Sequence, residues 1–139
     1  MSPGGAATDL ERLGGDAGLR RLMERFVREM STDFVIGFLF EGKDLARISQ
    51  HEAELASGLF GGAMPYQGRP LASLHRAMRI HRGHFRRRLF VLRRTLEAEA
   101  VPPDLVERWI AHHASMEHAI VLDADCLPDP SPAGDSDRN

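Results

Sequence analysis

The chain has 139 residues, with 18 lysines and arginines against 20 aspartates and glutamates and a formal net charge of −2 at pH 7. This length allows one sizeable core but not two ordinary domains, and the balanced charge gives no overall field favouring nucleic acid or an anionic membrane. The single cysteine, Cys126, excludes an internal disulfide and a zinc site built from several thiolates, which fits a reducing compartment.

Both ends of the chain are poor in residues that fill a core. Residues 1–8 are mostly Gly, Ala, Ser and Pro, and residues 126–139 combine prolines with acidic and small side chains. We therefore predict disordered ends around one folded domain at residues 9–125. The start of the chain has no basic flank before an apolar core, and no run approaches about 18 apolar residues. We expect a cytoplasmic protein that does not span a membrane.

Two helices are predicted in the first half of the chain from apolar residues that recur every three or four positions. The first covers residues 17–30, and its stripe is Leu19, Leu22, Met23, Phe26, Val27 and Met30. The second covers residues 44–59 and ends at the Gly61-Gly62 pair. Its stripe is Leu45, Ile48, either Glu52 or Leu55, and Leu59.

Two more helices are predicted in the second half. One begins near His84 and ends before the pair Pro102-Pro103, with Phe85, Leu89, Leu92 and Leu96 along its stripe. The last begins at that proline pair, and its stripe is Leu105, Trp109, His112 and Met116. With no internal repeat and little β-like alternation, the pattern favours an all-α fold.

The segment from Gly61 to Gly83 is predicted to be a loop with one or two helical turns, and it carries His75. His75 is either a partly buried histidine bonded to a carbonyl or a ligand. Zinc is disfavoured because no His-Glu-x-x-His or Cys-x-x-Cys spacing occurs. A haem site needs one imidazole, an apolar pocket, an aromatic ring and cations near the propionates. The chain supplies phenylalanines around the second predicted helix and arginines around His75.

Four motifs in order, "LGGDAGLRRLMERF", "LFGG", "YQGRPLASLH" and the "HF" nine residues beyond His75, make the chain resemble a truncated haemoglobin of the first group. The resemblance covers roughly residues 10–122. It implies a two-over-two helical sandwich, haem b as cofactor and a diatomic gas as ligand. It also places His75 at the proximal iron ligand and Phe40 at the phenylalanine that packs on the haem.

The distal side departs from that family pattern. Val27 stands where the group usually has a tyrosine that hydrogen-bonds the bound ligand, and valine cannot donate. Ile48 replaces a distal glutamine or leucine, and Glu52 replaces a glutamine. Glu52 either accepts a hydrogen bond from a distal imidazole or an iron-bound water, or faces solvent, and we expect it to face solvent. Arg88 stands where an apolar or tryptophan residue faces the haem, so either its helix is rotated or a cation reaches the pocket or a propionate. The other residues expected to contact haem are Leu55 and Tyr66.

Two further histidines have roles that the resemblance implies. His51 matches a cyanobacterial distal histidine that binds the iron as a sixth ligand, or else it is a solvent-facing residue at the edge of the stripe. His118 matches a histidine that can bond covalently to a haem vinyl group, although an exposed histidine near a fraying helix end is the favoured interpretation. His112 and His113 are expected to pack or to lie at the surface.

Three hypotheses for the function follow. The first is a haem globin that binds O₂, NO or CO and serves redox, nitrosative-stress or sensing chemistry rather than bulk oxygen storage. The second is a haem-dependent nitric oxide dioxygenase or peroxidase-like enzyme with Glu52 or His51 as an acid-base group beside the iron, although neither residue alone establishes catalysis. The third is a haem-free helical module whose arginine face binds an acidic partner. We expect a redox partner and a monomer or weak dimer.

Nucleic acid is not expected as a partner, although the sequence contains the arginine run "HRGHFRRRLFVLRR" at residues 81–94. The run lacks interleaved exposed aromatic residues, and Phe85, Leu89 and Leu92 alternate with the arginines at helical spacing. This pattern is typical of a solvated basic face.

Overall fold

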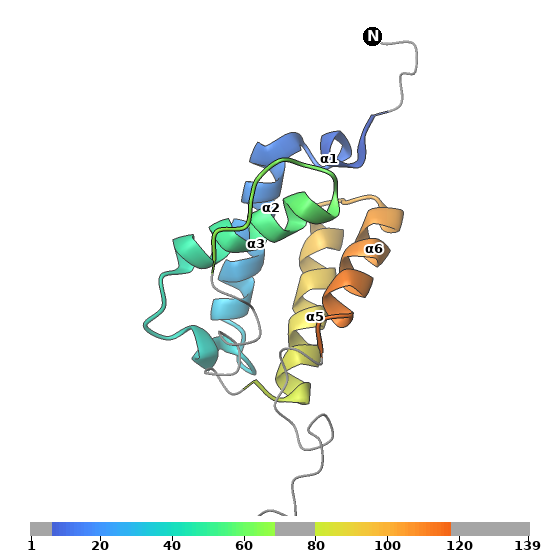
Figure 1. Cartoon of the computed structure of the whole chain (residues 1–139). Coiled ribbons are helices and arrows are strands. Elements are labelled where there is room, and N and C mark those ends of the chain that lie inside the picture. The colour runs from blue at the N-terminus through green and yellow to red at the C-terminus, as the bar shows by residue number, and fades with distance from the viewer. Residues whose placement is uncertain (1–6, 69–79, 118–139) are drawn as a thin grey trace, which may run out of the picture.

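The computed structural model describes residues 7–68 and 80–117, and every regular element in these two ranges is helical. The elements are α1 (Asp9–Arg12), α2 (Gly15–Ser31), the 3₁₀-helix η1 (Gly37–Phe40), α3 (Leu45–Leu59), α5 (Arg82–Ala98) and α6 (Pro103–Ala114). In Figure 1, α3 crosses α2, while α5 and α6 run side by side as a second pair. Helix α2 also packs on α5, which joins the two pairs. The all-α prediction is confirmed for the described residues.

The helices begin at residues that satisfy their free N–H groups. The Thr8 hydroxyl accepts from the Glu11 N–H at 3.1 Å, and the Glu11 carboxylate accepts from the Thr8 N–H at 3.0 Å. Asp44 caps α3 by accepting from the Arg47 N–H at 3.1 Å. Pro103 occupies the first turn of α6, where a missing N–H costs nothing. All four predicted helices are present, with ends within about two residues of those expected.

The turn between α1 and α2 depends on glycines. Gly14 and Gly15 have φ of 92° and 71°, which is the left-handed region that favours glycine. Gly18, inside α2, faces the preceding turn so closely that an added Cβ would lie 2.0 Å from the Leu13 carbonyl oxygen. The close approach brings α1 onto the start of α2 and requires a residue without a side chain at this position.

We expect Gly18→Ala to lower the free energy of unfolding by at least about 1 kcal/mol, because the Leu13 backbone must move to admit the methyl group. Gly58 in α3 is the matched control, since a Cβ added there would meet no atom within 4 Å. Gly58→Ala should raise the same free energy by about 0.5–1 kcal/mol through helix propensity. Urea unfolding measures both, and equal effects would contradict the assigned contact.

The core is built mainly from α2, α5 and α6. Its largest fully buried side chains include Trp109, Phe26 and Phe85, and the edge of the Phe60 ring packs on Trp109 with centroids 4.9 Å apart. Ile80 and Phe85 form a second, smaller cluster with partly buried apolar neighbours. These neighbours are Leu39, Leu89 and Met116.

The apolar stripes predicted for α3 and α6 are wrong in part. On α3, Leu45 is exposed, while Ile48, Leu55 and Leu59 are only half-buried. The buried residues of α3 are instead polar or small: Ser49, Glu52, Ala53, Glu54, Ala56 and Ser57. Small residues let α3 approach α2 closely, so its larger side chains lie at the edge of the contact. On α6 the buried histidine is His113, four residues after Trp109, whereas His112 is half-buried.

Candidate functional site

Several predicted haem contacts gather on one stripe of α3 and on the elements beside it. Ile48, His51 and Leu55 recur at spacings of three and four, so they share one helical face, and all three are half-buried. Phe40 ends η1 and is also half-buried, while Val27 is fully buried in α2. His75 and His118 lie outside the described residues.

His51 contacts the aromatic ring of Tyr66. Their ring centroids are 5.6 Å apart at an interplanar angle of 66°, which is an edge-on arrangement. The segment carrying Tyr66 is held to α3 by Glu54, whose carboxylate accepts from the Gln67 N–H at 2.9 Å. Tyr66 therefore comes to the same face of α3 as His51, as the resemblance implies for a shared site.

A buried charge cluster joins three helices. Arg88 of α5 donates through Nη2 to both Glu52 carboxylate oxygens of α3, at 2.9 and 3.0 Å. The same nitrogen lies 3.3 Å from Nδ1 of His113 in α6. The exposed fractions of the Arg88 and Glu52 side chains are only 16% and 11%. The expectation that Glu52 faces solvent is wrong, because pairing with Arg88 stabilises its charge inside the protein.

Arg88 lies inside the protein, against side chains of α2. Its guanidinium carbon lies 5.1 Å from the centre of the Phe26 ring, and Nη1 lies 3.6 Å from the Met30 sulfur. A cation therefore does reach the interior, beside Phe26 and Met30 of α2. The Arg88 Nε atom is buried and has no hydrogen-bond partner among the described residues.

His113 is neutral in this cluster. Burial first, and then the positive charge of Arg88, lower the pKa of His113 to about 3, although Glu52 acts in the opposite direction. Because arginine can only donate, Nδ1 of His113 accepts and its proton resides on Nε2. The sequence predicted only a packing or surface residue here and not this contact; the four-residue spacing from Trp109 was the signal that could have found it.

The arginines of α5 are largely neutralised by carboxylates from other elements. Arg87 bonds Asp33 at 2.8 Å, and the Arg87 hydrogen bond, against the effect of burial, holds the pKa of Asp33 below its usual value. Arg93 bonds Glu107 at 2.6 Å, and Arg94 bonds Glu29 at 3.4 Å. The expectation that the run lacks an exposed aromatic residue is wrong, because Phe90 is 51% exposed.

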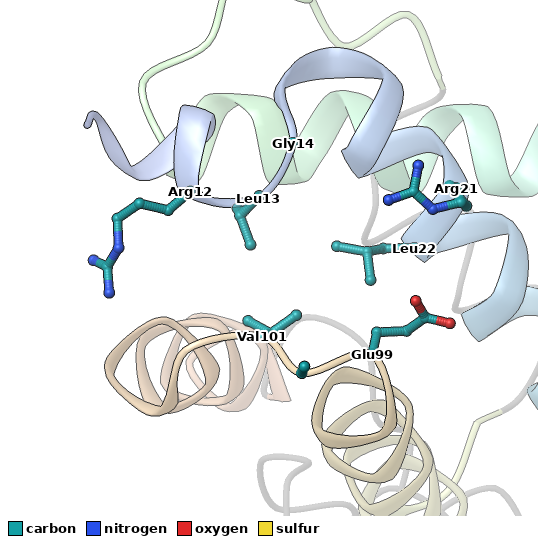
Figure 2. Close-up of a pocket in the computed structure, with 8 residues that line it drawn as sticks. Arg12, Leu13, Gly14, Arg21, Leu22, Glu99 and Val101 are labelled. Carbon is teal, nitrogen blue, oxygen red and sulfur yellow. The ribbon is translucent and has the colours of Figure 1, made fainter.

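A separate cleft lies between the α1–α2 turn and the residues that join α5 to α6. It has a volume of about 230 Å³. Figure 2 shows Leu13 and Leu22 pointing toward Val101 across it, with charged side chains at its ends. None of the predicted haem contacts lines this cleft, so it is not the candidate site.

Residues 7–68 and 80–117 contain neither a metal-binding group of side chains nor a membrane-spanning helix. No three His, Cys, Asp or Glu side chains there are grouped so as to hold a metal ion by themselves. Within the same ranges, no helix has the length and apolar character needed to cross a membrane.

Comparison with known proteins decides the family. A family profile described as bacterial-like globin matches residues 8–122. The chain belongs to this family. A group 1 truncated haemoglobin of Mycolicibacterium paratuberculosis is 31% identical over 101 residues, which cover 72% of this chain and 74% of that protein. One from Synechocystis is 28% identical over 116 residues, covering 81% of this chain and 94% of that protein.

Solved structures show the same architecture. The truncated haemoglobin of Tetrahymena pyriformis in its Fe(III) form has a TM-score of 0.73 at 19% identity, covering 84% of this chain and all of that one. The 2/2 haemoglobin of Synechococcus, in the cyanomet state with covalently attached haem, has a TM-score of 0.72 at 26% identity. That match covers 81% of this chain and 95% of the other. The predicted two-over-two fold and group I truncated globin family are confirmed.

As a truncated globin the chain binds haem, and its described residues fit that group. Ile48, Leu55 and Phe40 are apolar but only half-buried, so they still have surface to offer a flat apolar molecule. The unsatisfied Nε of Arg88 adds one polar donor inside. When bound, haem supplies iron that binds diatomic gases, while the protein governs access and polarity around it.

Proposed function

We propose that His75 binds the haem iron, that Phe40 packs on the macrocycle, and that a diatomic gas binds on the side of Val27, Ile48 and Leu55. The observation that carries this proposal is the fully buried Val27 at the position of the family's tyrosine, on the helix whose Phe26 and Met30 contact Arg88 of the Glu52–Arg88 pair. Val27 offers no hydroxyl donor, whereas the Glu52–Arg88 pair brings charged groups against the same helix. This arrangement favours redox, nitrosative-stress or sensing chemistry over bulk oxygen storage.

His51 is proposed as a displaceable sixth ligand of the iron. Its place on the stripe with Ile48 and Leu55 supports this role. The contact with the Tyr66 ring supports the competing interpretation, in which His51 only packs at the edge of the site. A coordinated His51 would have to leave before a gas could bind, which suits electron transfer or sensing.

The experiment is an absorption spectrum of the purified protein with haemin, ferric and then ferrous, with and without CO. We expect His75→Ala to lose stable haem binding and His51→Ala to convert a low-spin ferrous spectrum to high-spin. His112→Ala, a half-buried histidine of α6, is the control and should leave the spectrum unchanged. A high-spin wild-type spectrum that is insensitive to His51→Ala would overturn the sixth ligand. No haem uptake would favour the haem-free interaction module.

Covalent attachment of haem through His118 is a further proposal, supported by the covalently attached haem of the Synechococcus protein. Extraction with acidified organic solvent separates the possibilities, because only a free haem leaves the polypeptide. We expect haem to stay with the wild-type chain and to be extracted from His118→Ala. Complete extraction from the wild type after reduction would contradict the attachment.

An enzymatic role is favoured by one observation, the interior Glu52–Arg88–His113 cluster, which places ionisable groups near the expected ligand side. Turnover of peroxide or of NO by the haem-loaded protein tests it. Unchanged rates in Glu52→Gln and His51→Ala would count against catalysis. A redox partner, a cytoplasmic location and a monomeric or weakly dimeric state complete the proposal.

A further inference from the structure

Arg88 has more hydrogen-bond donors than its described neighbours can accept. Its Nη2 nitrogen faces all three strong acceptors, the two Glu52 oxygens and His113 Nδ1. By contrast, Nη1 has only the Met30 sulfur at 3.6 Å, a weak acceptor, and Nε has none. Nη2 is therefore saturated and Nε has no acceptor, although the side chain is only 16% exposed.

The Nε donor needs an explanation, because a buried N–H without a partner costs about 1–3 kcal/mol. The Phe26 ring lies 5.1 Å from the guanidinium carbon and offers no lone pair, and Val27 cannot accept through its side chain. Glu52 and His113 bond Nη2 and leave Nε without a partner among the described residues. An acceptor from outside the described chain would satisfy it.

We propose that Arg88 is the hydrogen-bond donor for a small anion bound on the ligand side of haem, through Nε, and that Glu52 and His113 are positioning residues that fix its orientation. This inference rests on the proposed haem site. The ligand class is a small anion such as azide, fluoride or nitrite. A planar, permanently charged guanidinium suits this task because Nη2 can hold the positioning groups while Nε donates to the ligand.

Positioning from two helices gives the arrangement its specificity. Glu52 of α3 and His113 of α6 approach the same nitrogen, so the guanidinium plane is fixed by groups far apart in the sequence. The Glu52 carboxylate neutralises the charge of Arg88, and this weakens the electrostatic attraction between Arg88 and an anion. The site therefore has a defined donor direction with a moderated charge.

The test is azide binding to the ferric, haem-loaded protein, together with the C–O stretching frequency of its ferrous CO complex. The decisive pair is Glu52→Gln and Glu52→Gln/Arg88→Met, which differ only in the arginine. We expect the double variant to bind azide at least about tenfold more weakly, or about 1.4 kcal/mol. A positive charge near the bound CO draws electrons onto the ligand and weakens the C–O bond. The double variant lacks the Arg88 charge, so its C–O stretching frequency should be higher than that of Glu52→Gln.

The positioning residue and the control are tested by the same two measurements. His113→Phe removes an acceptor and should shift both readouts in the direction of arginine loss, while His113→Gln retains an acceptor and should restore them. Arg93→Met is the control, because Arg93 lies on the same helix in an exposed pair with Glu107. It should leave azide binding and the C–O frequency unchanged.

Two results would overturn the inference separately from the haem site. If the single and double variants take up haem but share one azide affinity and one C–O frequency, Arg88 has only a structural role. If the double variant does not fold, Glu52→Gln against wild type decides: azide should bind more tightly once the carboxylate charge is removed, and equal affinity would refute the role. Failure of the wild type to take up haem would overturn the proposed function as well.

Discussion

Replacing Arg88 with methionine is expected to lower the free energy of unfolding by about 3–5 kcal/mol, since the buried Glu52 carboxylate loses the guanidinium that pairs with it. Glu52 is 9% exposed, and its carboxylate lies 2.9 Å from Arg88 Nη2. In the variant this carboxylate would stay inside the protein but would lose that guanidinium. Methionine fills most of the volume, so the loss is electrostatic and not a cavity effect. Urea unfolding at pH 7 of the protein without haem measures it directly.

Two comparisons separate this effect from a general loss of charge. Glu52→Gln/Arg88→Met removes both charges and should recover most of the lost stability, because no unpaired ion is left. Arg93→Met breaks an exposed pair, in which the Arg93 and Glu107 side chains are 38% and 65% exposed, and should cost about 1 kcal/mol or less. An Arg88→Met cost as small as that of Arg93→Met would show that the buried pair adds nothing.

Lowering the pH from 7 to 5 is expected to cost the native state about 2 kcal/mol through His113 alone. Burial, and then Arg88, lower the pKa of this histidine from 6.5 to about 3 in the folded protein. The unfolded chain therefore binds a proton below pH 6.5 that the native state does not. The contribution of His113 to stability is complete above that pH and is lost progressively as the pH falls toward about 3.

The groups around His113 define the control for this effect. Arg88 on α5 opposes protonation, Glu52 on α3 favours it, and His112 on the same helix opposes it. His113→Gln removes the titrating group. Between pH 7 and 5, the unfolding free energy of this variant should therefore fall by about 2 kcal/mol less than that of the wild type. His112→Gln should retain the wild-type dependence. Parallel curves for wild type and His113→Gln would show that His113 is not buried as a neutral group.

Local signals in the sequence were enough to locate the helices and their ends. Apolar spacing located α2, α3, α5 and α6, the glycine pair marked the end of α3, and the proline pair marked the start of α6. These signals depend on helical periodicity and on the backbone limits of glycine and proline, both of which can be read within a few residues. The ordered motifs also sufficed to indicate the globin family.

The charge cluster, by contrast, exists only once the helices have packed. Glu52 and Arg88 are 36 positions apart and Arg88 and His113 are 25 apart, so no local pattern could pair them. Glu52 was expected to face solvent because a carboxylate on an amphipathic helix is normally stabilised by water. Here α3 packs against α2 through small residues while α5 brings a guanidinium to the same place, and the paired charges are stable where each alone would not be.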